Sequence, residues 1–433
     1  MIDVLTFRTE GLGDSTYLVT FQGLAVLVDP QRDIERFLAA LDSSEPRWVL
    51  ETHLHNDYVS GGLAAARRTG AELVMPAAAA PAFAHTPAFH MEDLVEGDLA
   101  VRPIHTPGHT PEHTSYLILV DGNPQAVFSG GSLLVGSAGR SDLLGPERAE
   151  TLARLQFGSV RRLAALPGET GLYPTHGAGS FCTVSEAGEA TSTIARERRD
   201  NPALTAPDAD DFVGTHLAGL QPYPRYYARM APINLRGPAP MPQDPAPRSD
   251  PSALDPTSTV VDIRPASSYA AGHLPGSVNI PLSEQFGTWF GWLIPADAEA
   301  HLVAENEAEV DEALLQLRRI GIDQVAGVVL PDGDVSGVES RTALVSEIPA
   351  DGQILDVRSP AEREQLAPEG TLYRYLPDLL DGPPPEMDQA EPVWVICASG
   401  YRSAIAASLL RHQGIDAIPV LDGSVADLVQ QPV

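Results

Sequence analysis

The chain has 433 residues, room for about two to four domains that each bury a core, with 43% hydrophobic and 20% charged residues. Its formal net charge is -30, from 58 acidic and 28 basic side chains, and every one of those 28 is an arginine. Such a charge excludes nucleic acid and anionic membranes as partners, because both are themselves negatively charged.

Cysteine use and hydropathy predict where the protein works. Only two cysteines occur, Cys182 and Cys397, and their wide separation argues against a disulfide framework. No apolar run approaches the length of a membrane span, and the amino terminus lacks the charged-then-apolar pattern of an export signal. We therefore expect free thiols, no membrane association and a cytoplasmic location.

The amino-terminal half alternates strand and helix patterns. Three β-rich runs, residues 4–7, 15–21 and 24–28, are separated by glycine-containing turns and followed by a helical stretch over residues 34–41. An apolar strand over residues 47–50 and a helix over residues 63–69 come next, with Gly70 as the helix stop. This order predicts a sheet with helices laid on it.

A run of metal-ligand residue types joins that last strand to that helix. His53, His55 and Asp57 alternate there within five residues. Neutral imidazole nitrogens and carboxylate oxygens suit a divalent metal, while the alternative role of the same residues is to cap the helix that follows.

Three later segments also follow apolar strands. His109 lies in a Thr-Pro-Gly-His run, Gly131 in a Ser-Gly-Gly-Ser run after a strand over residues 125–128, and His176 in a Tyr-Pro-Thr-His-Gly run. Four ordered sites of this kind are a more specific signal of a metal cavity than a single His-x-His-x-Asp motif.

These four segments resemble the signature of the metallo-β-lactamase superfamily. Within that superfamily, the chain is similar to the persulfide dioxygenases. The segments that carry this similarity are Thr-His-Leu-His-Asn-Asp-Tyr, His-Gly-Ala-Gly-Ser-x-Cys, Asn-Pro-Ala-Leu from position 201, and residues 221–230. The resemblance covers about the first 240 residues and implies an αββα sandwich. It also implies one Fe(II) held at positions 53, 109 and 131, in a cavity that Asp57 and His176 line as well.

Position 131 departs from the family pattern, because Gly131 stands where relatives carry the ligand aspartate. Glycine cannot complete a two-histidine, one-carboxylate triad. The nearest unused donor in sequence is His55, so we hypothesise a neutral site of His53, His55 and His109 that binds Fe(II) weakly or takes Zn(II) instead. Tyr58 replaces a histidine of the dinuclear hydrolases, so at most one metal is expected. The substitution Gly131→Asp is predicted to raise the occupancy of this metal site.

A proline-dense linker divides the chain and is followed by an internal repeat. After residues 237–257, a strand pattern ending in Asp-x-Arg occurs twice, about 94 residues apart, and both copies resemble rhodanese domains. We expect an α/β multidomain protein with a metallo-β-lactamase-like αββα domain and two small rhodanese-like α/β domains. Their ranges are 1–236 for the first domain, 237–257 for the linker, and 258–345 and 346–433 for the two copies.

The two copies differ where the chemistry of a rhodanese would lie. In the second copy, an apolar strand leads into a loop and a helix expected over residues 403–413. The loop, which resembles the rhodanese active-site loop, consists of Cys397, Ala398, Ser399, Gly400, Tyr401 and Arg402. A helix amino terminus and the Arg402 cation favour the Cys397 thiolate, and residues 398–401 would bind the substrate. The first copy has residues 304–310 there, with three carboxylates and no nucleophile, which predicts a scaffold or docking module.

The resemblances imply two joined activities in sulfur metabolism. A persulfide dioxygenase would oxidise glutathione persulfide with O2 to sulfite, and a sulfurtransferase would act through a Cys397 persulfide, with low-molecular-weight thiols, persulfides and thiosulfate as partners. Two alternatives stay open: a sulfurtransferase with a degenerate metal domain, which Gly131 favours, and a metal-dependent thioester hydrolase of the glyoxalase II type. Formation of a homo-oligomer, the physiological thiol and the direction of sulfur flow also stay open.

Overall fold

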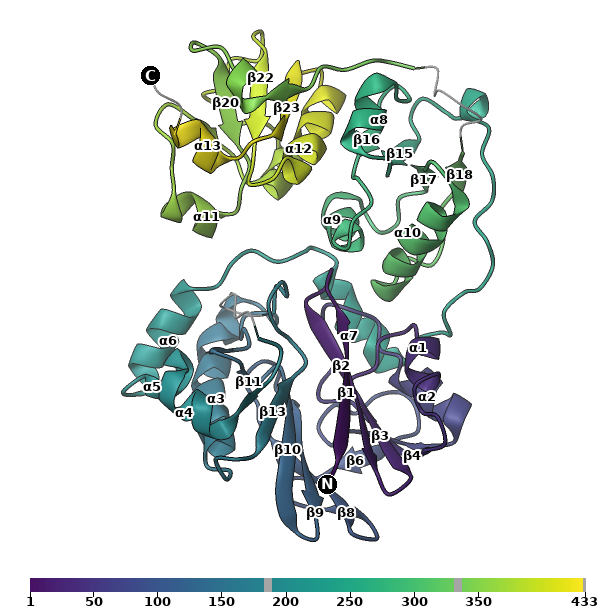
Figure 1. Cartoon of the computed structure of the whole chain (residues 1–433), viewed down its shortest axis with the longest axis vertical. Coiled ribbons are helices and arrows are strands. Elements are labelled where there is room, and N and C mark those ends of the chain that lie inside the picture. Colours follow the sequence, from purple (N-terminus) through teal and green to yellow (C-terminus); the bar gives the residue numbers. More distant parts are fainter. Residues whose placement is uncertain (183–188, 331–336, 431–433) are drawn as a thin grey trace. The chain divides into compact units, whose positions relative to one another are not determined.

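The computed structural model describes residues 1–182, 189–330 and 337–430 (Figure 1). The chain forms two compact units, the first Met1–Pro242 with Arg318–Gly321 and the second Gln243–Leu317 with Ile322–Val433. The expected linker over residues 237–257 contains the point where the chain first passes from one unit to the other. Among the described residues, no helix is both long and apolar enough to cross a membrane.

Two six-stranded sheets form the centre of the first unit. The first sheet has the order β1-β2-β3-β4-β5-β6, antiparallel from β1 to β3 and parallel from β3 to β6. Its strands are β1 (Asp3–Thr9), β2 (Asp14–Phe21), β3 (Leu24–Val28), β4 (Glu45–Leu50), β5 (Glu72–Pro76) and β6 (Thr86–Ala88). The second sheet, in the order β14-β13-β10-β9-β8-β7, consists of β7 (Leu94–Glu96), β8 (Leu99–His105), β9 (Thr114–Val120), β10 (Asn123–Gly130), β13 (Gly171–Pro174) and β14 (Ser192–Thr193). A short hairpin, β11 (Leu133–Leu134) and β12 (Ser137–Ala138), follows β10.

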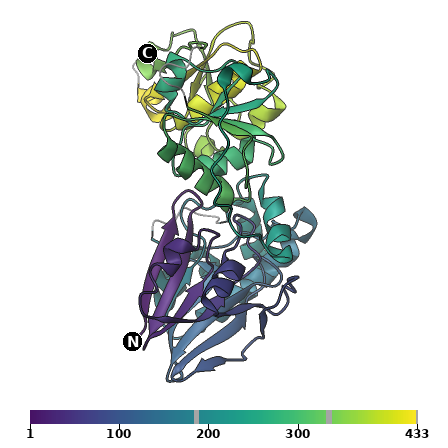
Figure 2. The same ribbon diagram turned by 90° about the vertical axis from the view of Figure 1, so that its right-hand side faces the viewer.

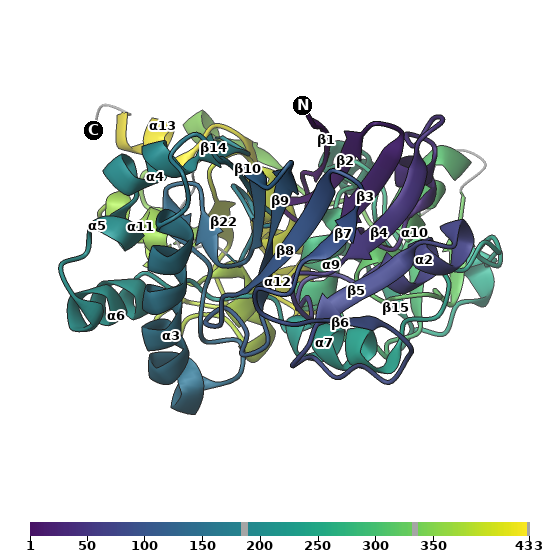
Figure 3. The same cartoon turned by 90° about the horizontal axis from the view of Figure 1, so that it is seen from below.

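Helices lie on the outer faces of both sheets, so the predicted αββα sandwich is confirmed (Figure 3). They are α1 (Glu35–Leu38), α2 (Gly62–Thr69), α3 (Pro146–Ala164), α4 (Ile194–Asp200), α5 (Pro202–Thr205), α6 (Ala209–Ala218) and α7 (Tyr227–Arg236). Helix α2 ends at Gly70 as expected, with a left-handed φ of +79° that suits glycine. Helix α1 is shorter than the stretch expected over residues 34–41, because the N–H groups of Ala40 and Leu41 bond to carbonyls three residues earlier instead of four.

Three apolar clusters hold these layers together. The central one joins the facing sides of the two sheets and contains Trp48 and Tyr116. A second packs β10 and β13 against α3, and a third packs β3, β4 and β5 against α2. Each large side chain buried this completely contributes about 1.5–3 kcal/mol relative to exposure. The loops at the strand ends therefore sit on a rigid frame.

The second unit contains two copies of one α/β arrangement, drawn from green to yellow in Figure 2. The first copy has the sheet order β16-β15-β17-β18 and the second β21-β20-β22-β23, with β19 beside β23, and all these pairs are parallel. The first copy comprises β15 (Thr259–Asp262), α8 (Ala266–Ala271), β16 (Val278–Asn279), α9 (Phe286–Leu293), β17 (Ala300–Val303), α10 (Glu307–Arg319) and β18 (Gly327–Val329). The second comprises β19 (Ala343–Leu344), β20 (Gln353–Asp356), α11 (Pro360–Gln365), β21 (Leu372–Tyr373), β22 (Val393–Ile396), α12 (Tyr401–His412), β23 (Ala417–Asp422) and α13 (Val425–Gln430). The sequence repeat thus coincides with a repeat in topology.

A buried ion pair lies at the end of β15 in the first copy and of β20 in the second. Arg264 bonds the Asp262 carboxylate at 2.6 Å and the Gly272 carbonyl at 2.8 Å, and Arg358 bonds the Asp356 carboxylate at 2.8 Å. A charge buried this deeply needs such a partner. The Asp-x-Arg motif therefore fixes the backbone where each strand ends.

Candidate functional site

Three histidine rings meet in the first unit. His53 follows β4, His109 lies between β8 and β9, and His176 follows β13, and all three are buried. Their ring centroids are 4.8, 5.1 and 5.2 Å apart, nearly an equilateral triangle. Imidazoles around one metal ion have about this spacing, given metal–nitrogen bonds of about 2.1 Å.

In each of these rings, Nδ1 is already hydrogen-bonded to the protein. The partners are the Arg140 carbonyl at 2.7 Å for His109, the Asp14 carboxylate at 2.8 Å for His176 and the Thr52 hydroxyl at 2.9 Å for His53. An Nδ1 that donates in this way fixes the tautomer and leaves the Nε2 lone pair for a ligand. His109 Nε2 is buried and has no hydrogen-bond partner among the described residues.

The charge state of the three rings fits a cation between them. Burial lowers the pKa of His53 well below its usual value and that of His109 to about 3, so both rings are neutral at pH 7. Burial also disfavours charged His176, but the Asp57 and Asp14 carboxylates outweigh it and raise its pKa to about 9. The Nε2 atoms of His176 and His53 are 3.3 Å apart, close to the roughly 3.4 Å expected for two nitrogens on one tetrahedral ion. A metal ion can take the place of the proton between them.

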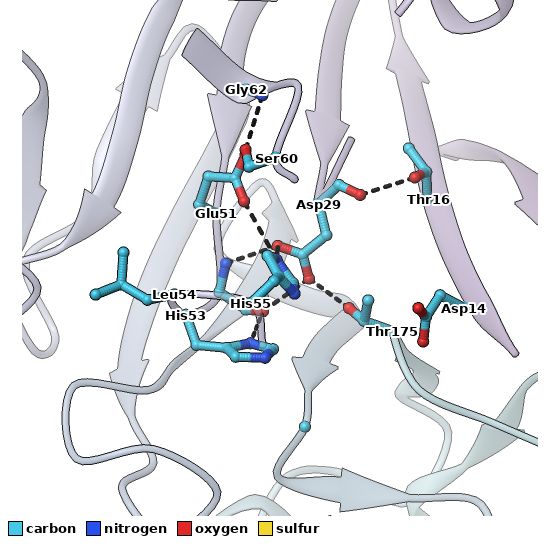
Figure 4. A network of polar contacts seen from close by, with 12 residues as sticks. Asp14, Thr16, Asp29, Glu51, His53, Leu54, His55, Ser60, Gly62 and Thr175 are labelled. Atoms are coloured by element: carbon cyan, nitrogen blue, oxygen red, sulfur yellow. Dashed lines mark hydrogen bonds and ion pairs between the residues drawn. The ribbon is translucent and has the colours of Figure 1, made fainter. Parts of the chain in front are cut away.

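His55 lies beside this triangle and takes part in a second network (Figure 4). Its Nε2 lies 3.3 Å from the Asp29 carboxylate, 3.2 Å from that of Glu51 and 3.1 Å from the Tyr58 hydroxyl. Burial disfavours charged His55, but Asp29 raises its pKa well above the usual value. His55 Nδ1 has no partner among the described residues, and a ring nitrogen of His55 lies within ligand distance of His53 and His176. The predicted set of His53, His55 and His109 stays a prediction, and the triangle adds His176.

Asp29 organises the metal-ligand loop. Its carboxylate accepts hydrogen bonds from the backbone N–H and the hydroxyl of Thr52, both at 2.7 Å, and from the Thr175 hydroxyl. Figure 4 shows Asp29 between His55, which lies two residues after His53, and Thr175, which directly precedes His176. Asp29 therefore connects two different loops of the cavity. The φ of Asp29 is +49°, an uncommon conformation for a non-glycine residue that tertiary contacts must stabilise.

Several residues that build this cavity were not singled out from the sequence. Asp14 and Asp29 hold the loops, and Asn234 on α7 donates to the His55 carbonyl at 2.9 Å. Asp29 follows an apolar strand directly, a signal that was present in the sequence, whereas Asn234 approaches the loop from far along the chain. Cys182, the cysteine of the His-Gly-Ala-Gly-Ser-x-Cys run, lies 3.6 Å from the Asp57 carboxylate.

The space at position 131 is filled by His109. A Cβ on Gly131 would lie 2.2 Å from Cδ2 and 2.7 Å from Nε2 of the His109 ring, and Gly131 N–H donates to His113 Nε2 at 2.9 Å. The expectation that Gly131→Asp restores a ligand is therefore reversed, because the new side chain would displace the ring that binds metal.

We expect Gly131→Asp to lower metal occupancy and to cost about 1–3 kcal/mol of stability, as overpacking does. Equilibrium dialysis with Fe(II) or Zn(II) and thermal unfolding measure the two effects. Gly158→Asp is the matched control, because a Cβ on Gly158 meets nothing within 4 Å. A higher metal occupancy in Gly131→Asp would show that the ring can move aside.

In the second unit, Cys397 directly follows β22 and is buried. The Gly400 N–H donates to Cys397 Sγ at 3.2 Å, and Gly400 precedes α12 with a φ of +85°. A Cβ at position 400 would lie 2.6 Å from the Leu421 carbonyl, so only glycine fits this turn. Ala398 and Ser399 are exposed, and Tyr401 donates its hydroxyl to the Pro281 carbonyl at 3.0 Å. The loop thus curls its backbone around a thiol at a helix amino terminus.

Arg402 forms a bidentate pair with Glu362 of α11. The two bonds measure 2.5 and 2.7 Å, and Ser359 also donates its backbone N–H and hydroxyl to Glu362 at 2.9 and 2.8 Å. Burial opposes ionisation of Glu362, but the hydrogen bonds and charge of Arg402 outweigh it and lower the pKa of the carboxyl to about 2. Glu362 therefore stays ionised, and its negative charge neutralises that of Arg402, from neutral pH down to about pH 2.

We expect Glu362→Gln to raise kcat/KM for thiosulfate about tenfold, because Arg402 gains free donors for a dianion and a charged hydrogen bond contributes about 1.5–3 kcal/mol. Sulfurtransfer from thiosulfate and from glutathione persulfide, measured in parallel, tests this. Glu364→Gln, an exposed position on the same helix, is the control. An unchanged ratio between the two donors would contradict this role of Glu362.

Comparison with known proteins agrees with the two-part organisation. The metallo-β-lactamase superfamily matches residues 9–176, and the rhodanese-like domain family matches residues 250–326, within the first copy. A hydroxyacylglutathione hydrolase of Anaeromyxobacter dehalogenans is 32% identical over 253 residues, 57% of this chain and 91% of the relative. A "Probable metallo-hydrolase" of Burkholderia pseudomallei is 31% identical, and the match spans 40% of this chain but only 65% of that protein.

The similarity to a solved structure extends beyond the first unit. A metallo-β-lactamase from Staphylococcus aureus is 28% identical with a TM-score of 0.71, and the match covers 76% of this chain and 99% of that one. This coverage exceeds the share of the chain that the first 242 residues make up, so the common fold continues past the linker. The chain therefore belongs to the metallo-β-lactamase superfamily, and its domain of that superfamily is joined to a rhodanese-like domain.

Proposed function

We propose that the protein oxidises low-molecular-weight persulfides at a single metal ion in the first unit and transfers sulfane sulfur through Cys397 in the second. The contact of the His53, His109 and His176 rings carries this proposal, with the Nε2 atoms of His53 and His176 3.3 Å apart and one ring nitrogen each of His109 and His176 within 4.8 Å. By resemblance, Tyr58 and Gly131 stand where a dinuclear hydrolase has ligands, so a single ion is proposed.

The donor set fits one divalent transition metal. Three buried imidazoles suit Fe(II) or Zn(II): His53 and His109 are neutral, and His176 would give up its proton to the metal. His109 Nε2 and Asp57 Oδ1 are buried polar atoms without a partner among the described residues. When bound, Fe(II) would supply the redox chemistry that joins dioxygen to sulfur. The chain supplies the geometry, since Asp14, Thr52 and the Arg140 carbonyl orient the three rings.

The overall oxidation balances with glutathione persulfide, dioxygen and water as reactants. The products are glutathione, sulfite and two protons, so only the outer sulfur is oxidised and the S–S bond breaks. An iron site charged only by its metal favours the anionic form of the persulfide as a ligand. The cavity of buried rings excludes bulk water from that contact.

The sulfurtransfer reaction uses Cys397 as the nucleophile. Its thiolate attacks the outer sulfur of a persulfide or of thiosulfate, the S–S bond breaks, and the thiolate or sulfite leaves. The Gly400 N–H and the amino terminus of α12 stabilise the resulting Cys397 persulfide. A second thiol then removes the sulfane sulfur and regenerates Cys397.

The direct test of the first activity is oxygen uptake by the iron-loaded full chain with glutathione persulfide. We expect one O2 consumed for each sulfite formed. Oxygen uptake no faster than in a metal-free sample would contradict the oxidation.

Thioester hydrolysis is the second candidate function, because the Anaeromyxobacter dehalogenans relative, which this chain matches over 91% of its length, is named a hydroxyacylglutathione hydrolase. Hydrolysis of S-lactoylglutathione by the zinc-loaded chain, without oxygen uptake by the iron-loaded chain, would favour it. Both activities would require the histidine triangle.

A further inference from the structure

We propose that Cys182 supplies the anionic metal ligand that position 131 lacks. The proposal deepens the proposed single-metal site and rests on it. Cys182 is the only described residue that adds a thiol to the cavity.

Cys182 lies at the wall formed by two rings of the triangle. Its Sγ and one ring nitrogen each of His109 and His176 lie within 4.8 Å of one another, and all three residues are buried. Because both Nδ1 atoms are already hydrogen-bonded, Nε2 is the nitrogen that each ring offers a metal. A nitrogen and a sulfur ligand on one tetrahedral ion are about 3.6 Å apart, so a shift of at most about 1 Å brings these atoms onto one centre.

One residue positions both Cys182 and His109. The Arg140 N–H donates to the Cys182 carbonyl at 3.0 Å, while the Arg140 carbonyl accepts from His109 Nδ1 at 2.7 Å. The Arg140 guanidinium is held by Asp142 at 2.7 and 2.8 Å and donates to the Phe181 carbonyl at 2.6 Å. The backbone at 181–182 is thus attached to the same turn that orients a metal-binding ring.

Two side chains contact the Cys182 thiol in the cavity. Its Sγ donates a long hydrogen bond, 3.6 Å, to Asp57 Oδ2, Tyr227 is a second hydrogen-bond partner, and Asp57 Oδ1 has no partner among the described residues. A divalent ion would replace the S–H proton, which passes to Asp57 or to water, and a metal–sulfur bond would form.

In this proposal, the Cys182 thiolate replaces the aspartate ligand that relatives carry at position 131. With His53, His109 and His176, a Cys182 thiolate gives three nitrogens and one sulfur, and it neutralises one metal charge as the family aspartate does. A thiolate is softer than a carboxylate, so this set favours Zn(II), Co(II) and Fe(II) over Mg(II) and Mn(II). Gly131 then provides room for the His109 ring.

Cobalt spectroscopy tests the proposal without depending on enzyme activity. Co(II) is added to full-length Cys397→Ser, in which Cys182 is the only cysteine left. A thiolate-to-cobalt charge-transfer band in the near ultraviolet is expected, and it must come from Cys182. Adding Cys182→Ser should remove the band and weaken Co(II) binding by roughly 10–100-fold or more.

The Co(II) experiment tests the Cys182 ligand and the single-metal site separately. If Co(II) binds with d–d bands but no charge-transfer band, Cys182 is not a ligand, while the single-metal site stands. If Cys397→Ser with intact circular dichroism binds no Co(II), both the ligand assignment and the metal site are overturned.

Discussion

Replacing Cys397 by alanine should lower sulfurtransfer from thiosulfate or glutathione persulfide to cyanide by at least about 10³-fold, as removal of a covalent nucleophile does. The thiol lies at the amino terminus of α12 and accepts the Gly400 N–H at 3.2 Å, whereas the first copy has buried Ala304 after its corresponding strand β17. No second sulfur carrier is therefore available in the described part of this unit.

Cys182→Ser is the control for this experiment. It lies in the first unit, so most of the sulfurtransfer should remain, and trapping of a persulfide with iodoacetamide followed by mass spectrometry should label Cys397. Transfer that survives Cys397→Ala would remove Cys397 from the mechanism.

His109→Ala should have the largest effect on the first unit. It removes a metal donor whose Nε2 is otherwise unpartnered, so metal affinity should fall by more than the roughly 10–100-fold that loss of an outer partner costs. Oxygen uptake with glutathione persulfide should fall with it, while Cys397-dependent transfer persists. Equilibrium dialysis and oxygen electrode measurements on the same preparation give both values.

His90→Ala, at an exposed histidine of the same unit, is the matched control and should retain the metal. Circular dichroism of each variant checks that the fold is intact. Unchanged metal affinity in a folded His109→Ala protein would exclude the histidine triangle as the metal site.

The strands and the ligand motifs were predictable because their signals are local. β-rich runs between glycine-containing turns marked β2 and β3, Gly70 marked the end of α2, and the repeated Asp-x-Arg marked the two copies in the second unit. The active-site loop was also readable, although α12 begins at Tyr401 instead of residue 403 because Gly400 makes the turn.

The contacts around the ligands were not predictable, because they join residues distant in sequence. Asp14 reaches His176 across 162 positions, and Glu362 reaches Arg402 across 40. The role of Gly131 depends on where one ring lies, since only the position of His109 shows that the space is filled. Sequence alone also favoured His55 as a ligand by proximity. Its Nε2 contacts Asp29 and Glu51, a ring nitrogen of His55 lies within 4.8 Å of those of His53 and His176, and its role as a ligand stays a prediction.

The central claim is that the first unit retains a single-metal site although position 131 is glycine. Metal analysis by inductively coupled plasma mass spectrometry, after Fe(II) loading and desalting of the full chain, tests this claim most directly. We predict about one metal ion per chain in the wild type, as the histidine triangle implies, and loss of that ion in His109→Ala. A wild-type chain that retains no more metal than His109→Ala would contradict the claim and leave Cys397 sulfurtransfer as the function of the protein.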